Sequence, residues 1–215
     1  LTSVFPHHGV FDGKIAHPLR PPKPSGTVYA RQIPWLDGVF SLDVATLDDL
    51  PLVHRWMNDP RVNEFWHEAG DEDRHRKYLE GMFADPHIMP LIGRFDNRAF
   101  AYFEVYWAKE DIVGTFCDAG DYDRGCHVIV GEENCRGRDW FTAWLPSLLH
   151  FMFLDDPRTQ RIVQEPSSGH HRQLRNLQKS GFSHIRSVDL PTKHAAIMAI
   201  SRQRFFADRL WHPAA

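Results

Sequence analysis

The sequence contains few cysteines, and their spacing argues against a metal site. Cys117, Cys126 and Cys135 are the only ones, and they follow a C-x8-C-x8-C spacing rather than the C-x2-C spacing typical of zinc sites. An odd number of thiols also disfavours a framework of disulfides. We therefore expect three free thiols, no bound metal, and a reducing compartment such as the cytoplasm.

Several other common signals are missing. No run of about 18 apolar residues occurs, so no membrane contact is predicted, and the start, LTSVFPHHGVFDGK, has no secretory signal and no initiator Met. Lys and Arg number 25 against 28 Asp and Glu. Because nucleic-acid binding needs a basic excess, no nucleic-acid partner is expected. There is also no G-x-S-x-G, Walker or Rossmann glycine pattern.

The 215 residues, 42% of them hydrophobic, suit one globular domain with an additional arm. Residues 1–36 are rich in Pro, His and Gly, which predicts an extended N-terminal arm rather than a helix. Tyr29 and Trp35 indicate that the second half of this arm packs on the domain. The domain itself is expected to span residues 37–215.

Within the domain, the hydrophobic pattern alternates between helix and strand periods. It predicts an α+β fold with one mostly antiparallel sheet and helices on both faces. A turn at Asp96-Asn97 is typical of a hairpin, and Gly181 of a helix end. The expected strands are 39–45, 88–95, 99–108, 125–131, 161–166, 183–191 and 194–206, and the expected helices are 46–59, 70–86, 136–154 and 170–182.

The segment CRGRDWFTAWL follows the apolar strand residues Val128, Ile129 and Val130 after a short polar stretch that begins at Gly131. Gly137 permits a turn, and the N–H groups of Arg138, Asp139 and Trp140 then point out of the helix start. With Arg136 and Arg138 beside them, these groups suit a pyrophosphate. A plain left-handed turn with solvated arginines explains the same residues, and the local sequence favours neither.

A histidine and a glutamate stand on two successive expected strands. His127 begins an apolar strand segment, and Glu165 ends the next short strand, before Pro166. A lone strand histidine is more often a hydrogen-bonded core residue, but neighbouring strands can bring these two together. The carboxylate would then orient the imidazole and raise its basicity.

The strand YFEVYWA supplies candidates for a substrate pocket. Glu104 and Tyr106 share one face, and Trp107 faces the other. Together with Asn58 at the end of the first helix, they suit an extended cationic amine. The alternative is a strand whose aromatic residues belong to the core while Glu104 is solvated. His170 and His171 are adjacent and cannot share a helix face, so a metal site there is not expected.

In this order the segments resemble the GNAT superfamily of acyl-CoA N-acyltransferases. CRGRDWFTAWL occupies the place of its R-G-x-G-x-G/A loop, and RNLQKSGF is similar to its helix-ending E-K-x-G-F signature. Within it, the chain resembles the siderophore acyltransferases that convert hydroxylated amines to hydroxamates, of the aerobactin and mycobactin types. That closer resemblance covers residues 37–206 and rests on the segments WMNDP, PLIG, FEVYWAKED, DYDRGCHVIVG and RIVQEP.

The resemblance implies a GNAT fold, an acyl-CoA donor (acetyl-CoA or succinyl-CoA), a cytoplasmic enzyme and direct transfer without an acyl-enzyme. His127 would be the base, with Glu165 orienting it, and Val128 or Ile129 would hold the thioester oxygen. A small hydroxylamine is the expected substrate, and a siderophore synthetase the expected pathway neighbour or fused domain. Asp139 and Phe141 depart from the glycines of the family loop, and His170 stands where an asparagine is common near the cofactor.

Two other functions fit the sequence. The chain can be an acyltransferase for an ordinary amine such as lysine or an aminoglycoside, since fold and loop would serve equally well. It can also be an inactive acyl-CoA-binding domain, which the altered loop supports.

Overall fold

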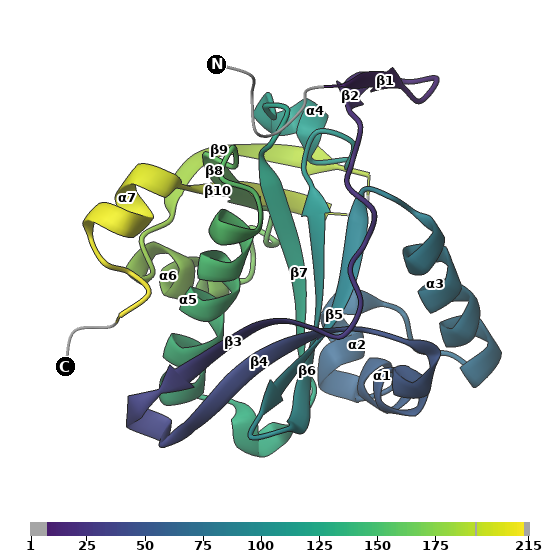
Figure 1. The fold of residues 1–215 in the computed structure, drawn as a ribbon, viewed down its shortest axis with the longest axis vertical. Coiled ribbons are helices and arrows are strands. Elements are labelled where there is room, and N and C mark those ends of the chain that lie inside the picture. Colours follow the sequence, from purple (N-terminus) through teal and green to yellow (C-terminus); the bar gives the residue numbers. More distant parts are fainter. Residues whose placement is uncertain (1–7, 192, 213–215) are drawn as a thin grey trace.

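An eight-stranded sheet organises the computed structural model, which describes residues 8–191 and 193–212. Its strand order is β3-β4-β5-β6-β7-β8-β10-β9, and all neighbours pair antiparallel except β7 and β8. Figure 1 shows the sheet twisting between two groups of helices. The strands are β3 (Thr27–Ile33), β4 (Gly38–Val44), β5 (Ile88–Phe95), β6 (Arg98–Trp107), β7 (Arg124–Val130), β8 (Arg161–Gln164), β9 (Ser183–Leu190) and β10 (Lys193–Ser201).

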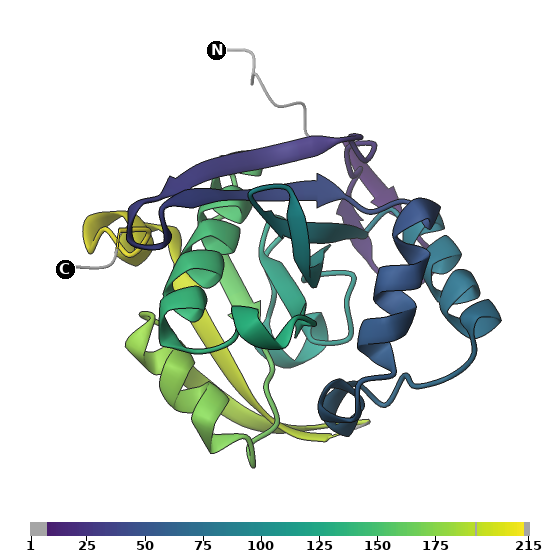
Figure 2. The same cartoon turned by 90° about the horizontal axis from the view of Figure 1, so that it is seen from below.

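Helices cover both faces of the sheet, as the hydrophobic pattern predicts. One core lies between α1, α3 and side chains such as Tyr102 and Ile129. The other lies between α5, α6, α7 and side chains such as Phe103. The two groups lie on opposite sides in Figures 1 and 2. The helices are α1 (Leu50–Met57), α2 (Pro60–Trp66), α3 (Glu72–Ala84), α4 (Gly114–Cys117), α5 (Arg138–Asp155), α6 (His171–Lys179) and α7 (Arg202–Ala207), with 3-10 turns at Pro34–Leu36, Leu47–Asp49 and Glu133–Cys135.

Two of the expected elements end early, and a separate helix follows each of them. The helix expected over 46–59 ends at Met57, and a separate helix α2 begins at Pro60, where the Asp59 side chain accepts from the Arg61 N–H. Proline is favoured at the first position of a helix, so it starts α2 as well as stopping α1. The strand expected over 194–206 ends at Ser201, whose side chain caps α7. The prediction of one long strand there was wrong.

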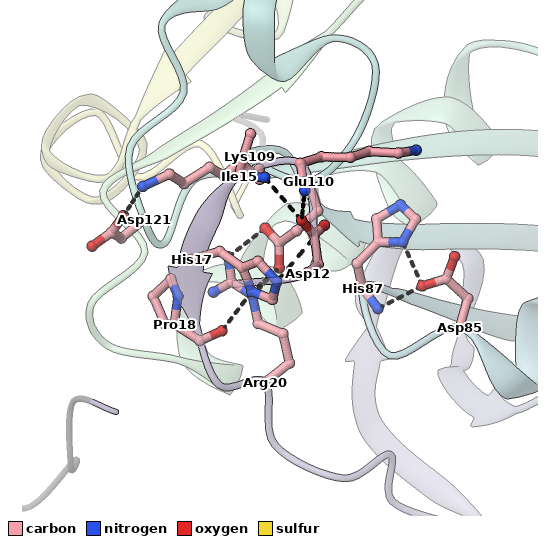
Figure 3. A network of polar contacts seen from close by, with 11 residues as sticks. Asp12, Ile15, His17, Pro18, Arg20, Asp85, His87, Lys109, Glu110 and Asp121 are labelled. Atoms are coloured by element: carbon pink, nitrogen blue, oxygen red, sulfur yellow. Dashed lines mark hydrogen bonds and ion pairs between the residues drawn. The ribbon is translucent and has the colours of Figure 1, made fainter. Parts of the chain in front are cut away.

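The expected N-terminal arm has regular structure of its own. β1 (Gly9–Phe11) and β2 (Ala16–Pro18) form a two-stranded sheet, and β3 is part of the main sheet. Figure 3 shows how the arm is fixed: Arg20 donates two hydrogen bonds to Glu110, at 2.5 and 2.6 Å. Tyr29 packs on the domain as expected, with its hydroxyl 2.9 Å from His150 Nδ1.

The strands β7 and β8 separate soon after they pair, which is the feature that positions the site. Their parallel pairing covers only Arg124–Ile162 and Gly125–Val163. Beyond Gln164 the chain instead follows β10, through the Ala196 N–H to Pro166 O bond at 2.9 Å. The backbone of β7 from His127 onward therefore has no strand beside it on the β8 side within the described residues.

Among residues 8–191 and 193–212, no helix is both long enough and apolar enough to cross a membrane.

Candidate active site

His127 lies between two carboxylates at the point where β7 and β8 separate. Its Nδ1 is 3.0 Å from Glu104 Oε2, and its Nε2 is 3.0 Å from Glu165 Oε1. Glu104 stands directly opposite His127 in the β6–β7 register, so the pair is set by strand pairing. Glu165 follows β8, which pairs with β7 only just before His127. The structure therefore joins the two residues that the sequence selects as a catalytic pair and adds Glu104 to them.

Both carboxylates are buried and further hydrogen-bonded. Glu104 is 2% exposed and its Oε1 accepts from the hydroxyls of Tyr78 and Tyr102. Glu165 is 7% exposed and its Oε2 accepts from the Tyr106 hydroxyl at 2.9 Å. These donors leave the carboxylates little freedom to move away from the imidazole. The His127 side chain, in contrast, is 35% exposed, so a ligand can reach it more easily than it can reach either carboxylate.

The two carboxylates determine the charge of His127. Burial alone lowers the pKa of this ring, but the charges and hydrogen bonds of Glu165 and Glu104 outweigh it and raise the pKa from 6.5 to about 10. For Glu165, burial works to raise the pKa, while His127 and the Lys193 ammonium, 3.7 Å away, lower it from 4.5 to about 2. These shifts favour the imidazolium form of His127 over a free imidazole base at neutral pH.

The backbone of β7 offers hydrogen-bond donors toward the separation from β8. Asp123 O accepts from Ala108, and the Gly131 N–H donates to Phe100, so in this antiparallel pair the odd-numbered residues of β7 direct their N–H and C=O groups to β6. Val128 and Val130 therefore direct theirs to the β8 side. The register places the Ile129 N–H on the β6 side, which corrects the expectation that Ile129 can hold a thioester oxygen.

Helix α2 bridges the two separating strands. Trp66 Nε1 donates to Val128 O at 3.3 Å, and its ring lies edge-on to His127 with centroids 6.1 Å apart. Phe65, the preceding residue, stacks on His170 with centroids 4.6 Å apart and an interplanar angle of 17°. Since Val128 belongs to β7 and His170 follows β8, these contacts connect both sides of the separation above His127.

The start of α5 has an open geometry, with a glycine of positive φ at its N-cap. Gly137 adopts a φ of 109° at the helix N-cap, a conformation that favours glycine. The first turn closes with the Phe141 N–H to Gly137 O bond, which leaves the N–H groups of Arg138, Asp139 and Trp140 without an intrahelical acceptor. The Arg138 and Asp139 side chains are exposed.

Arg136 and Arg138 have different surroundings, although they flank the same glycine. The guanidinium of Arg136 donates to Val130 O at 2.9 and 3.1 Å, to Gly131 O at 3.1 Å and to Asp59 Oδ2 at 3.3 Å. It therefore holds the loop between β7 and α5 to the end of β7. Of the two arginines, only Arg138 has the exposed position expected of a phosphate ligand.

The expected amine pocket does not assemble as the sequence suggested. Glu104 contacts His127 and is enclosed, and Trp107 packs on the other face of the sheet, between the guanidinium groups of Arg20 and Arg124 at 4.3 and 4.5 Å. The side chain of Asn58 binds the backbone of His54 and Gly70. The period of two along β6 accounts for the position of Trp107, which cannot share a pocket with Glu104.

The three cysteines and the metal-binding residue types give no sign of a metal or thiol centre within residues 8–191 and 193–212. Cys117, Cys126 and Cys135 are buried and free, and burial raises the pKa of Cys126 to about 12, which disfavours a nucleophilic thiolate. Among the residues that the structure describes, no cluster of three or more His, Cys, Asp or Glu side chains could hold a metal ion.

Four residues of the site were not selected from the sequence: Trp66, Tyr78, Tyr102 and Lys193. Tyr102 shares the Glu104 face of β6 by the period of two, so the alternation contained its signal. Tyr78 and Trp66 reach the site from α3 and α2, and no local pattern in a helix reports which strand it covers.

The fold is that of an α+β domain in which His127 and two carboxylates gather at the separation of two parallel strands. Residues 45–190 match the family model of the acetyltransferase (GNAT) domain, which is more than half of the chain. The chain therefore belongs to the GNAT acetyltransferase family, as its motifs predict.

Named relatives and a solved structure support this assignment. The chain is 45% identical over 195 residues to the hydroxyornithine transacylase SID3 of Ajellomyces capsulatus, covering 88% of this chain and 44% of the relative. It is 39% identical over 202 residues to the N(6)-hydroxylysine O-acetyltransferase of Escherichia coli, covering 93% and 64%. AAC(6')-Ib in complex with paromomycin and acetyl-CoA superimposes with a TM-score of 0.71 at 25% identity, over 79% of this chain and 97% of that one. The chain spans about half the length of the curated relatives it matches.

Proposed function

We propose that the chain transfers an acyl group from acyl-CoA to the nitrogen of an N-hydroxylated amine, giving a hydroxamate in siderophore biosynthesis. The observation that carries this proposal is the pairing of His127 with two carboxylates, each with an oxygen 3.0 Å from one ring nitrogen, so that neither nitrogen is a free base. An alkylammonium acceptor with a pKa of about 10.4 must lose a proton before it can attack. The site offers an imidazolium and a carboxylate whose pKa is about 2, and neither can remove that proton at neutral pH.

A hydroxylamine removes this difficulty. The electron-withdrawing oxygen makes its nitrogen much less basic than that of an alkylamine, so it is neutral and nucleophilic at physiological pH. The site then needs to act only after attack, when the nitrogen of the tetrahedral intermediate has become strongly acidic. The names of the two relatives, a hydroxyornithine transacylase and a hydroxylysine acetyltransferase, agree with such an acceptor.

The acyl donor is proposed to lie along β7 where β8 leaves it. The Val128 N–H would donate to the thioester oxygen, in the manner of an oxyanion hole. The open N–H groups at the start of α5, with Arg138 beside them, would bind the pyrophosphate. Acetyl-CoA in the complex of AAC(6')-Ib supports an acyl-CoA donor, and both acetyl-CoA and succinyl-CoA suit this arrangement.

The division of work within the catalytic pair changes from the one expected from the sequence. Attack forms the N–C bond, and collapse of the intermediate breaks the C–S bond and restores the carbonyl. Glu165 would accept the proton lost from nitrogen, and His127 would supply one to the departing sulfur, so that the pair ends with the protons it began with. His127 thus acts as a proton donor, whereas the sequence suggested a base.

The cellular setting remains the one that the sequence suggests. We propose a cytoplasmic enzyme, since acyl-CoA is its donor, working beside a siderophore synthetase or fused to one. An acyltransferase for ordinary amines remains the second function, since AAC(6')-Ib has the same fold. An inactive acyl-CoA-binding domain would leave the enclosed Glu104–His127–Glu165 chain without a role.

A panel of acceptors and donors tests this function. Acetyl-CoA and succinyl-CoA would each be offered with N-hydroxylysine, N-hydroxyornithine and the corresponding plain amines, with products read by mass. We expect turnover of the hydroxylated acceptors and little or none of the plain ones; preference for the plain amines would contradict the proposal. Colour with ferric iron separates an N-acyl hydroxamate from the O-acyl isomer that the name of the E. coli relative indicates.

A further inference from the structure

Glu104 is enclosed by donors that come from three different elements. The Tyr78 hydroxyl, on α3, and the Tyr102 hydroxyl, on β6, both donate to its Oε1, the latter at 3.0 Å. His127, on β7, occupies its Oε2 at 3.0 Å. With 2% of its surface exposed, Glu104 is out of reach of a substrate ammonium. Its partners limit it to acting through His127.

The tyrosines are fixed as hydrogen-bond donors. Burial and the neighbouring Glu104 raise the pKa values of Tyr78 and Tyr102 above the usual value of 10, so both keep their protons. Because each hydroxyl donates to the same oxygen, the carboxylate plane and its second oxygen are fixed too. The direction of donation along Tyr78, Glu104 and His127 is therefore set by the structure.

Other charged and polar groups also lie around the ring. Glu165 contacts Nε2, Lys193 lies 3.7 Å from Glu165, and the Tyr106 ring lies 4.9 Å from the imidazole. The charge of Glu68 helps to raise the pKa of Tyr78, and the charge of Asp111 that of Tyr106. Both carboxylates are more distant neighbours of His127 than the tyrosines are. Of these groups, Glu104 and Glu165 are the two that hydrogen-bond the ring, and Glu104 is the one on the side away from the separation of β7 and β8.

We propose that Glu104 is a positioning residue: held by Tyr78 and Tyr102, it fixes the His127 ring plane and the Nδ1 proton and favours the cationic imidazole at the start of each turnover. Nε2 then begins each turnover with its proton directed toward Glu165 and the reacting atoms. The consequence for turnover rests on the proposed function, whereas the consequence for the charge of His127 does not. Because Tyr78 belongs to α3, the orientation of His127 also depends on how α3 packs on the sheet.

The test is the titration midpoint of His127 in the free protein, followed by NMR of the labelled imidazole. Glu104→Gln keeps a hydrogen-bond acceptor and removes the charge, so we expect the midpoint to fall by about 1–3 units. Tyr78→Phe keeps the charge and removes one donor, so the midpoint should stay or rise. Glu110→Gln is the matched control, because Glu110 is buried in a comparable network around Arg20, away from His127.

A midpoint in Glu104→Gln equal to that of the wild type or Glu110→Gln would overturn the proposal. So would an equal fall in Tyr78→Phe, since that result would indicate general loosening. If Glu104→Gln does not fold, the His127 midpoints of Tyr78→Phe and Tyr102→Phe test the proposal instead. An unchanged or raised midpoint supports it, and a lowered midpoint contradicts it. These readouts need no substrate, so they remain valid if the acceptor assignment is wrong.

Activity gives a second readout of the same variants. In Glu104→Gln, the alkaline limb of the kcat profile should move to lower pH by the same shift, with the KM for acyl-CoA nearly unchanged. An equal loss of kcat at every pH would mean that Glu104 only supports the fold, and would also overturn the proposal.

Discussion

Arg136→Ala and Arg138→Ala should separate the stability of the β7–α5 loop from acyl-CoA binding. Arg136 donates to the carbonyls of Val130 and Gly131 and to Asp59, so its removal frees the loop from the end of β7. Arg138 is exposed in the first turn of α5. Its positive charge is repelled by the positive end of the helix dipole, so Arg138 destabilises the free helix slightly. A bound anion would be attracted by both.

Arg136→Ala is expected to lower thermal stability, and Arg138→Ala to lower acyl-CoA affinity. Hydrogen bonds to a charged group contribute about 1.5–3 kcal/mol, and since Arg136 is 26% exposed we take the low end, near 2 kcal/mol. In a chain of this size 1 kcal/mol shifts the Tm by about 2–4 °C, so Arg136→Ala should lose roughly 4–8 °C. Arg138→Ala should keep the Tm or raise it slightly, and weaken acyl-CoA binding about tenfold, which corresponds to about 1.4 kcal/mol.

Thermal unfolding without ligand and calorimetric titration with acetyl-CoA measure the two effects on the same samples. Arg136→Lys is the control for charge, because an ammonium cannot reach the same set of carbonyls as a planar fork. An Arg136→Ala protein with the wild-type Tm, or an Arg138→Ala protein with wild-type affinity for acyl-CoA, would refute the assignment of the two roles.

Three further variants test other parts of the account. In Gly125→Ala the new Cβ would lie 2.2 Å from the Tyr106 ring, so we expect a loss of about 1–3 kcal/mol by urea unfolding and lower turnover as Tyr106 leaves Glu165; a neutral variant contradicts this packing. Cys126→Ala should keep turnover and show no acyl adduct by mass; loss of turnover would restore a covalent route. For pH, the raised pKa of His127 gives stability that is complete below about 6.5 and lost as pH rises through about 10, whereas the lowered pKa of Glu165 gives stability lost as pH falls through about 2. The unfolding free energy of wild type minus His127→Gln should thus shrink between pH 6.5 and 10, and growth over that range would be the wrong sign.

The sequence predicted the parts of the fold that short-range signals specify. The turn at Asp96 and Asn97 has positive φ at both residues, as its composition predicts. Helix α3 is capped by Asp71 and ends before Pro86, and α6 ends just before Gly181, which has a φ of 96°. Pro60 shows the limit of such signals, because the same residue can end one helix or begin the next.

The site was predictable in part because His127 begins an apolar strand segment and Glu165 ends the next short strand. His127 and Glu165 could be selected from position and chemistry, and the structure brings them together. Glu104 was selected for a different task, because its face was known and its partner was not. That partner depends on the register of β6 against β7, which is fixed by pairing over the whole strand. The contact of Tyr78 with Glu104 could not be predicted from the sequence, because α3 and β6 meet only in the folded chain.

The most direct test of the account is a competition between N-hydroxylysine and lysine for acetyl-CoA, in wild type and His127→Ala, with both products quantified by mass. The account predicts that the wild type forms almost only the hydroxamate, and that His127→Ala loses about 10²–10⁴-fold in turnover with its acyl-CoA affinity kept. Equal use of both amines, or a loss below about tenfold in His127→Ala, would contradict an acyl transfer to hydroxylamines centred on His127.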